Sequence, residues 1–178
     1  MLQTDQINIA VMDDIPYLEL LVNGAYRGES SKKGWTTEAD LLDGIRTDRV
    51  SLTNMIQNPD AVILKYLDKE CRLLGCVYLQ KKQAKLYLGM LTVSPELQAR
   101  GIGKQLLAAA ENHAKRLACT AITMTVISIR QELIAWYERQ GYRATGETEP
   151  FPANPDFGLP RQPLHFIVME KPLLPTMH

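Results

Sequence analysis

The chain has 178 residues, 46% of them hydrophobic and 22% charged, which is typical of one globular domain rather than a disordered or collagen-like protein. Its 20 Lys and Arg residues balance 20 Asp and Glu residues, which argues against a surface devoted to nucleic acid or an anionic membrane. We therefore predict a single domain spanning residues 1–178, with no nucleic-acid partner.

The sequence also lacks the marks of a membrane or secreted protein. No run approaches the roughly 18–20 apolar residues of a membrane-spanning helix, and the first residues lack the basic and apolar segments of a secretory signal. Cys71, Cys76 and Cys119 are an odd number of cysteines, which suits a reducing compartment. Cys71 and Cys76 are also spaced more widely than a C-x-x-C pair. We expect a cytoplasmic protein with no membrane contact and no metal site.

The N-terminal region predicts a strand and then a helix. Residues 7–11 alternate between apolar and polar, which is typical of a half-buried strand. Asp13 or Asp14 can cap the following helix, whose first turn contains Pro16. The apolar positions are Ile7, Ile9 and Val11 in the strand and Leu18, Leu21, Val22 and Ala25 in the helix.

Two further helices follow a polar loop at residues 27–34. Thr36 or Thr37 can cap the first of them, with Glu38 near its positive end. Its inward-facing residues are Leu41, Leu42 and Ile45. The second is a short helix over residues 49–56.

The middle of the chain changes to a strand pattern and then returns to a helix. The β-rich runs 61–66, 72–80 and 85–93 are separated by polar residues, which predicts an antiparallel meander. A helical pattern then covers residues 103–118. Its apolar face comprises Leu106, Leu107, Ala110, Ala114 and Leu117.

The C-terminal third alternates strands with one helix. Residues 121–126 predict a buried strand, and Ser128-x-x-Gln131 is a capping box for a helix over 130–140 that Gly141 ends in a left-handed conformation. A strand begins at Tyr142, a proline-rich loop covers 148–163, and a last strand covers 164–170. The predicted class is α+β with one α/β crossover near the centre.

The clearest chemical signal is a glycine-rich turn between a predicted strand and a predicted helix. It comprises Gln98, Ala99, Arg100, Gly101, Ile102, Gly103 and Lys104. Successive N–H groups and the positive end of the helix favour a diphosphate there, and a glycine lets that group approach the backbone. A plain strand-to-helix turn is the alternative.

Two other phosphate-binding loops are excluded. The dinucleotide fingerprint requires a glycine where this chain has Leu106. The P-loop requires a hydroxyl residue after its lysine, where this chain has Gln105. We therefore expect the turn to bind a diphosphate without a metal ion, and we do not expect nucleotide hydrolysis.

The order of motifs resembles the GNAT superfamily of acyl-CoA-dependent N-acetyltransferases. Residues 91–95 (LTVSP) are followed by Gln98-x-x-Gly101-x-Gly103, which matches the Q/R-x-x-G-x-G/A coenzyme A loop, and residues 135–142 (AWYERQGY) resemble the Y-E-x-x-G-F/Y segment. The resemblance covers essentially the whole chain. It implies α/β/α layers around a mixed, mostly antiparallel sheet of about six or seven strands, with a splayed strand pair and about four helices.

The resemblance also implies acetyl-CoA as co-substrate. The backbone from Gln98 to Lys104 would hold the pyrophosphate, and main-chain groups of Leu91 and Val93 would pair with the pantetheine amides. The strand ending at Val93 would splay from its neighbour, and an N–H near Met90 or Leu91 would polarise the thioester carbonyl.

Two residues of the last predicted helix region matter for this chemistry. Tyr137 stands where many members place a tyrosine that protonates the departing thiolate, although it shares a helix face with Leu133 and could equally be a core residue. Arg130 stands where many members place an asparagine that helps to hold the cofactor. We include Arg130 among the expected cofactor contacts.

The acceptor side is less defined by the sequence. Glu29, Trp35, Thr36 and Phe151 are the candidate acceptor-binding residues. Residues 85–93 contain no carboxylate, so a base would come from solvent or from Glu29, Glu38 or Glu132. His113 and His165 are expected to be structural. An α-amino group, with a pKa of about 7.7–8.0, is neutral at pH 7 far more often than a lysine amine at about 10.4.

These observations predict an N-acetyltransferase that acts by direct transfer on the primary amine of a small molecule, such as an amino acid or an amino-acid-like compound. A non-catalytic acyl-CoA-binding module and a protein lysine or N-terminal acetyltransferase are the alternatives. A homodimer is expected only by analogy with the family.

Overall fold

The protein is described by a computed structural model that covers residues 6–26, 42–43, 47–97, 101–150, 159–160 and 164–174. Within these residues a seven-stranded sheet has the order β1-β3-β4-β5-β6-β9-β7. Its strands are β1 (Ile7–Ile9), β3 (Ala61–Leu67), β4 (Leu73–Lys82), β5 (Lys85–Val93), β6 (Ala121–Ile127), β7 (Arg143–Pro150) and β9 (His165–Pro172). All neighbouring pairs are antiparallel except β5 and β6, which confirms the predicted mixed sheet.

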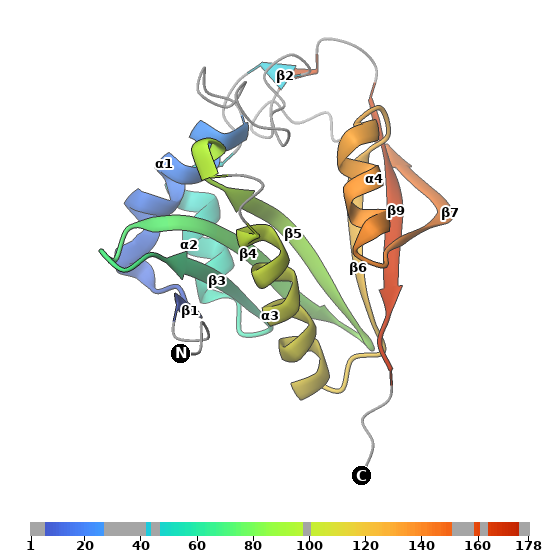
Figure 1. Cartoon of the computed structure of the whole chain (residues 1–178), viewed down its shortest axis with the longest axis horizontal. Helices are drawn as coiled ribbons and strands as arrows, with labels where there is room; N and C mark the ends of the chain where they lie inside the picture. The colour runs from blue at the N-terminus through green and yellow to red at the C-terminus, as the bar shows by residue number, and fades with distance from the viewer. Residues whose placement is uncertain are drawn as a thin grey trace.

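Helices cover both faces of this sheet. The helices are α1 (Ile15–Tyr26), α2 (Arg49–Gln57), α3 (Ile102–Arg116) and α4 (Gln131–Arg139), with short 3-10 turns η2 (Met12–Asp14) and η4 (Pro95–Leu97). Figure 1 shows α3 and α4 in front of the sheet and α1 and α2 behind it. The predicted α/β/α layers are confirmed, as are the helices that became α1, α2 and α3 and the meander β3–β4–β5.

The sheet separates two hydrophobic cores because successive strand residues point to opposite faces. Ile63 belongs to the core under α1 and α2, together with Leu18, Val22 and Leu52. Its neighbour Leu64 belongs to the core under α3 and α4. Both faces of the central strands are therefore held in place by a packed helix.

The sheet opens between β5 and β6. The two parallel strands pair only from Lys85 with Ala121 to Tyr87 with Thr123. In β5 the pairing with β4 also shifts: Cys76 pairs with Thr92 and Tyr78 with Gly89, so two residues of β5 oppose one of β4. This β-bulge bends the strand. The predicted splay at the end of β5 is confirmed.

The first predicted strand is shorter than expected. It ends at Ile9, and the side chains of Ile9 and Val11 are 57% and 53% exposed. β1 is an edge strand that pairs only with β3, and after Ile9 the chain turns into η2, where the Val11 N–H donates to the Asp14 carboxylate at 2.7 Å. Ala10 is buried instead, and its N–H donates to the Ile63 carbonyl.

Two other segments differ from the prediction. Leu42, expected in a helix, lies in the two-residue strand β2 (Leu42–Asp43), which pairs with β8 (Leu159–Pro160). That partner is too distant in the sequence for local periodicity to reveal it. The prediction of a loop over 148–163 is wrong at its start, because Thr148 to Pro150 pair with β9 as part of β7.

The capping box predicted for α4 is wrong. Arg130 is the N-cap residue, and the Ser128 N–H donates to the His165 carbonyl at 2.9 Å. The Gln131 side-chain amide donates to the Ser128 carbonyl at 3.2 Å. Ser128 therefore continues the pairing of β6 with β9 rather than opening the helix. Gly141 follows the helix with φ +100°, the left-handed conformation that was predicted.

Candidate active site

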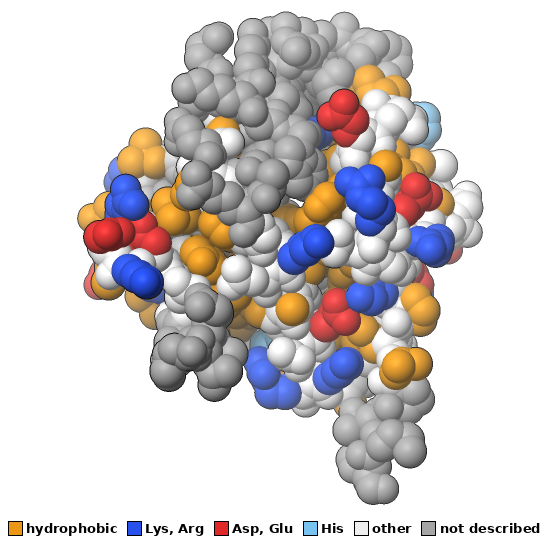
Figure 2. All heavy atoms as spheres, in the orientation of Figure 1, with side chains coloured by type: hydrophobic (Ala, Val, Ile, Leu, Met, Phe, Trp, Pro, Cys, Tyr) orange, Lys and Arg blue, Asp and Glu red, His pale blue; other side chains and the backbone are white. Residues whose placement is uncertain are grey.

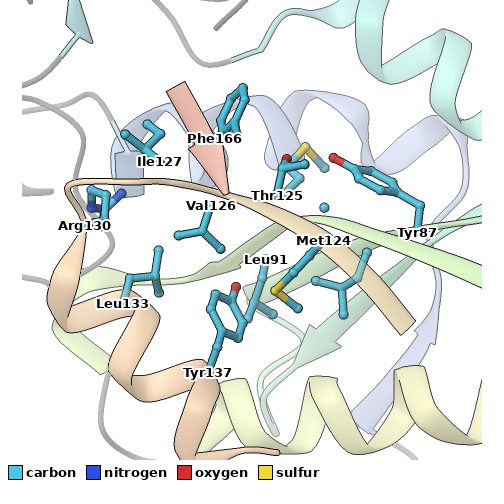
Figure 3. Close-up of a pocket in the computed structure, with 13 residues that line it drawn as sticks. Tyr87, Leu91, Met124, Thr125, Val126, Ile127, Arg130, Leu133, Tyr137 and Phe166 are labelled. Atoms are coloured by element: carbon cyan, nitrogen blue, oxygen red, sulfur yellow. The ribbon is translucent and has the colours of Figure 1, made fainter. Parts of the chain in front are cut away.

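A cavity of about 130 Å³ lies where β5 and β6 separate. Figure 3 shows its lining residues. They come from three places: Tyr87, Leu88, Gly89, Met90 and Leu91 on β5; Met124, Thr125, Val126 and Ile127 on β6, with Phe166 of β9 beside them; and Arg130, Leu133 and Tyr137 at α4. The gap in the sheet is thus reached by side chains from both of its faces.

The bulge shapes one wall of this cavity. Met90 has φ +53°, a left-handed conformation that costs a residue with a side chain about 1–2 kcal/mol. The buried Thr92 hydroxyl donates to the Met90 carbonyl at 2.9 Å. Residues held in such conformations cluster at functional sites, because there the local geometry outweighs its cost.

The start of α3 packs between α4 and the end of β5, since a Cβ at Gly103 would lie near both Trp136 and Val93. Gly101 is the N-cap with φ +84°, and a Cβ on it would meet no atom within 4 Å, so the backbone conformation is what calls for glycine. Gly103 has a different reason: a Cβ there would lie 3.3 Å from the indole of Trp136. The expectation that both glycines serve only a diphosphate is therefore incomplete, since Gly103 also lets α3 pack on α4.

The other residues of the predicted loop divide into two groups. Ile102 is buried in the core and Lys104 is exposed on α3. Gln98, Ala99 and Arg100 lie outside the described residues.

Tyr137 has its ring in the core and its hydroxyl at the cavity. The residue is 6% exposed, and its ring makes edge-to-face contacts with Trp136 and Tyr142 at centroid distances of 5.1 and 5.7 Å. Figure 3 shows its hydroxyl pointing toward Leu91 and the space between the strands. The core interpretation and the catalytic interpretation of Tyr137 are therefore compatible.

Tyr142 lies behind Tyr137 and does not line the cavity. Its side chain is completely buried, which raises the pKa of its phenol, and nearby Glu111 adds to the effect. Within the described part of the chain its hydroxyl has no hydrogen-bond partner. We assign Tyr142 a packing role under α4.

Arg130 lies at the end of the cavity where the strands are apart. It is 9% exposed, and among the described lining residues it is the one charged side chain. Its guanidinium brings a planar set of N–H donors to this end of the cavity. The pairing of the strands is lost toward this end, which makes it the open end of the gap.

The remaining predicted residues are placed as follows. Leu91 lines the cavity, and Val93 is buried at the end of β5. Glu29, Trp35, Thr36 and Phe151 lie outside the described residues, as does Glu38. Glu132 is exposed on α4, and neither it nor the two histidines His113 and His165 line the cavity.

The sequence analysis missed Tyr87, Thr125 and Phe166. Figure 3 shows them on the side of β6 opposite Tyr137. Tyr87 lies two residues before Gly89 in the sequence, which already indicates that the two residues share one face of β5. Thr125 and Phe166 gave no local signal, because their place depends on the pairing of β6 with β9.

Three further observations concern surface charge, metal binding and membrane crossing. The face shown in Figure 2 carries both basic and acidic side chains. On α3 and α4 the exposed charged residues include Lys104, Lys115 and Arg139 as well as Glu132 and Glu138. In the described ranges, no cluster of three His, Cys, Asp or Glu side chains could hold a metal ion. None of the described helices is both long and apolar enough to cross a membrane.

A family model for the acetyltransferase (GNAT) family matches residues 21–142. The chain belongs to the GNAT acetyltransferase family. It is therefore an acyl-CoA-dependent N-acetyltransferase, and acetyl-CoA is its co-substrate. The matched region contains β5, β6 and α4, which supply most of the residues that line the cavity.

Solved structures of GNAT enzymes share the fold. The ribosomal-protein-S18-alanine N-acetyltransferase from Escherichia coli has a TM-score of 0.71 at 13% identity, covering 97% of this chain and 95% of that one. A ribosomal-protein-alanine N-acetyltransferase from Brucella melitensis has a TM-score of 0.68 at 20% identity, covering 94% and 99%. A protein from Bacillus anthracis assigned as a streptothricin acetyltransferase, in complex with acetyl coenzyme A, has a TM-score of 0.58 at 20% identity, covering 68% and 67%. No curated protein matches in sequence.

Proposed function

We propose that this GNAT enzyme transfers the acetyl group of acetyl-CoA directly to the primary amine of a small molecule, an amino acid or an amino-acid-like compound. The observation that carries the proposal is the cavity between β5 and β6, with the bulge at Met90 on one wall and the Tyr137 hydroxyl directed into it.

The cofactor would run along the open edge of β5. The N–H groups from Gln98 to Lys104 hold the pyrophosphate at the start of α3, where the helix dipole favours an anion. Main-chain groups of Leu91 and Val93 pair with the pantetheine, and Arg130 supplies positive charge at the open end of the cavity.

Different residues at the cavity would assist different parts of the acyl transfer. Bound acetyl-CoA supplies the activated acetyl group. A backbone N–H at the Met90–Leu91 bulge donates to the carbonyl oxygen, on which negative charge grows. Tyr137 holds a proton at its hydroxyl for the thiolate that departs as the C–S bond breaks, and it regains that proton from solvent.

The lining of the described cavity supports a small acceptor. The walls on the side of Tyr87 are neutral, and no carboxylate lines the described cavity, whereas a site for lysine-rich proteins would favour acidic side chains. A second candidate is N-terminal acetylation of a protein. Its support is that two structures with this fold over more than nine-tenths of the chain are named for alanine acetylation of ribosomal proteins.

Calorimetric titration with acetyl-CoA tests the cofactor site. We expect saturable binding by the wild type and none by Gly101→Glu, because that change adds an anion and a side chain at φ +84°. Gly24→Glu is the matched control, since a Cβ at Gly24 on α1 also meets no atom within 4 Å. Binding that Gly101→Glu leaves unchanged would remove the basis of the proposal.

Thiol release tests the reaction and its acceptor. Acetyl-CoA is offered with free amino acids, phosphinothricin, streptothricin and a peptide that begins with alanine. Release with a small amine supports the first candidate, and release only with the peptide supports the second. Tyr137→Phe should lower kcat with little change in KM for acetyl-CoA. An unchanged kcat at saturating amine would exclude Tyr137 as the acid, provided that chemistry limits the rate.

Three broader predictions remain part of the proposal: a single domain over residues 1–178, a cytoplasmic location and a homodimer. The homodimer rests on family analogy alone. Sedimentation velocity of the full chain gives its mass in solution directly.

A further inference from the structure

Tyr87 carries its hydroxyl toward the bulge along its own strand. The ring lies over Gly89, two residues further on: a Cβ at Gly89 would be 2.9 Å from Tyr87 Cε2 and 3.0 Å from Tyr87 Oη. No residue with a side chain could stand at Gly89 without moving this ring. The phenol oxygen is thereby brought beside Gly89, the neighbour of the strained Met90.

The ring is held in this position by its surroundings. Tyr78 packs against it edge-to-face, with ring centroids 6.4 Å apart, and the Lys82 ammonium lies 4.6 Å from its centroid. A cation over an aromatic face is attracted to it. Tyr87 is thus oriented before any substrate arrives, which is what a group that must meet a reacting atom requires.

Tyr87 and Tyr137 reach the same cavity from opposite sides. Both line it, and Figure 3 shows Tyr137 on the α4 side of β6 and Tyr87 on the other side, near Thr125. With Tyr137 assigned to the sulfur, Tyr87 faces the direction from which an acceptor would come. No described carboxylate lies at this side of the cavity. Glu132 is exposed on α4, and Glu170 is paired with Lys85 at 2.7 Å.

We propose that Tyr87 is a second catalytic residue, which accepts a hydrogen bond from the attacking amine and relays the proton that the amine loses. This inference rests on the proposed function. As the N–C bond forms and the C–S bond breaks, the amine nitrogen gives one proton to Tyr87 Oη, and the Tyr87 hydroxyl passes its own proton to water. Tyr137 gives its proton to sulfur and regains one from solvent, so an amine and a thioester become an amide and a thiol.

This relay fits the chemistry of a phenol. A phenol that keeps its own proton is by itself a poor base for an amine. In a relay, the oxygen accepts one proton while it releases another, and the residue stays neutral throughout. General acid–base groups of this kind contribute about 10²–10⁴-fold to a rate.

Tyr87→Phe tests the relay and Tyr66→Phe is its matched control. Phe keeps the ring over Gly89 and removes only the oxygen. Tyr66 is a buried residue on β3 whose hydroxyl donates to Gln6 Oε1 at 3.1 Å and which does not line the cavity. The assay is coenzyme A release from acetyl-CoA with the best amine of the panel and with hydroxylamine, a small amine that is already neutral at pH 7.

We expect Tyr87→Phe to lower kcat/KM for the amine about 100-fold while KM for acetyl-CoA changes less than about twofold. Added imidazole should restore part of the rate in Tyr87→Phe and not in the wild type, which a packing role would not produce. Tyr66→Phe should retain wild-type kcat/KM. Full activity of Tyr87→Phe in an active enzyme would overturn the relay and leave the proposed function intact. A wild type that releases no coenzyme A would overturn both.

Gly89→Ala gives an independent check. Its Cβ must displace the Tyr87 ring, so we expect a loss of kcat/KM similar to that of Tyr87→Phe. The double variant should then be little worse than either single one, because both changes remove the same hydroxyl from the cavity. If the fold-losses in kcat/KM of the two single variants multiply in the double variant, then Gly89 acts by shape alone. That result would contradict the role of the Tyr87 oxygen.

Discussion

A substitution that fills the cavity should raise the free energy of unfolding and at the same time weaken acetyl-CoA binding. A space that serves packing alone would not give both effects. Val126 is a buried residue of β6 whose side chain points into the space between the strands in Figure 3. Val126→Phe places an aromatic ring there, on a strand where aromatic residues are well tolerated. If the cavity exists to receive the acetyl thioester, this variant should be more stable than the wild type and unable to bind the cofactor normally.

The magnitude follows from the volume. Lost packing around a dry, closed void costs about 24 cal/mol per Å³, so for a cavity of about 130 Å³ that is open at one end, about 3 kcal/mol is an upper bound. A phenyl ring fills only part of this space, and we expect a gain of about 1 kcal/mol in the free energy of unfolding. For a chain of this size, that raises Tm by about 2–4 °C.

The control is Val77→Phe. Val77 is a fully buried valine of β4 that does not line the cavity, so a ring there overpacks the core and should cost about 1–3 kcal/mol. Thermal unfolding gives both stabilities, and acetyl-CoA titration should show affinity at least about tenfold weaker for Val126→Phe. If Val126→Phe is destabilised like Val77→Phe, or binds acetyl-CoA as the wild type does, the assignment of this space is wrong.

Two further predictions concern stability away from the cavity. Asp48 caps α2 by accepting a hydrogen bond from the Ser51 N–H at 2.7 Å, which lowers the pKa of its carboxyl. That stabilisation is present at neutral pH and is lost as the pH falls through the lowered pKa. Urea titration should show Asp48→Ala losing about 1 kcal/mol and Asp48→Asn less, and equal losses would contradict the cap. Burial, with Arg116 nearby, lowers the pKa of His113 below 6.5. The unfolded chain therefore binds that proton first, so stability falls as the pH drops below about 6.5. His113→Gln should flatten this dependence between about pH 7.5 and 5.5, and an unchanged slope would refute it.

Local patterns were sufficient for the elements whose partners are close in the sequence. The meander from β3 to β5 is bounded by short polar turns, and α3 has an unbroken apolar stripe, so each could be identified from its own residues. The glycine-rich turn could also be found, because Gly101 marks a left-handed N-cap whatever the rest of the chain does.

Features that depend on distant partners could not be read locally. Leu42 is a strand residue only because Leu159–Pro160 lie beside it, and Ser128 leaves its expected cap because His165 takes its N–H. The lining of the cavity was likewise only partly predictable. Tyr137 could be identified from its motif, whereas the place of Thr125 depends on the pairing of β6 with β9.

A crystal structure with acetyl-CoA tests the central claim most directly. The account predicts the acetyl thioester between β5 and β6, with its carbonyl oxygen at the Met90–Leu91 bulge, its sulfur near the Tyr137 hydroxyl and its pyrophosphate at the start of α3. A cofactor bound elsewhere, with the gap between these strands closed, would contradict it.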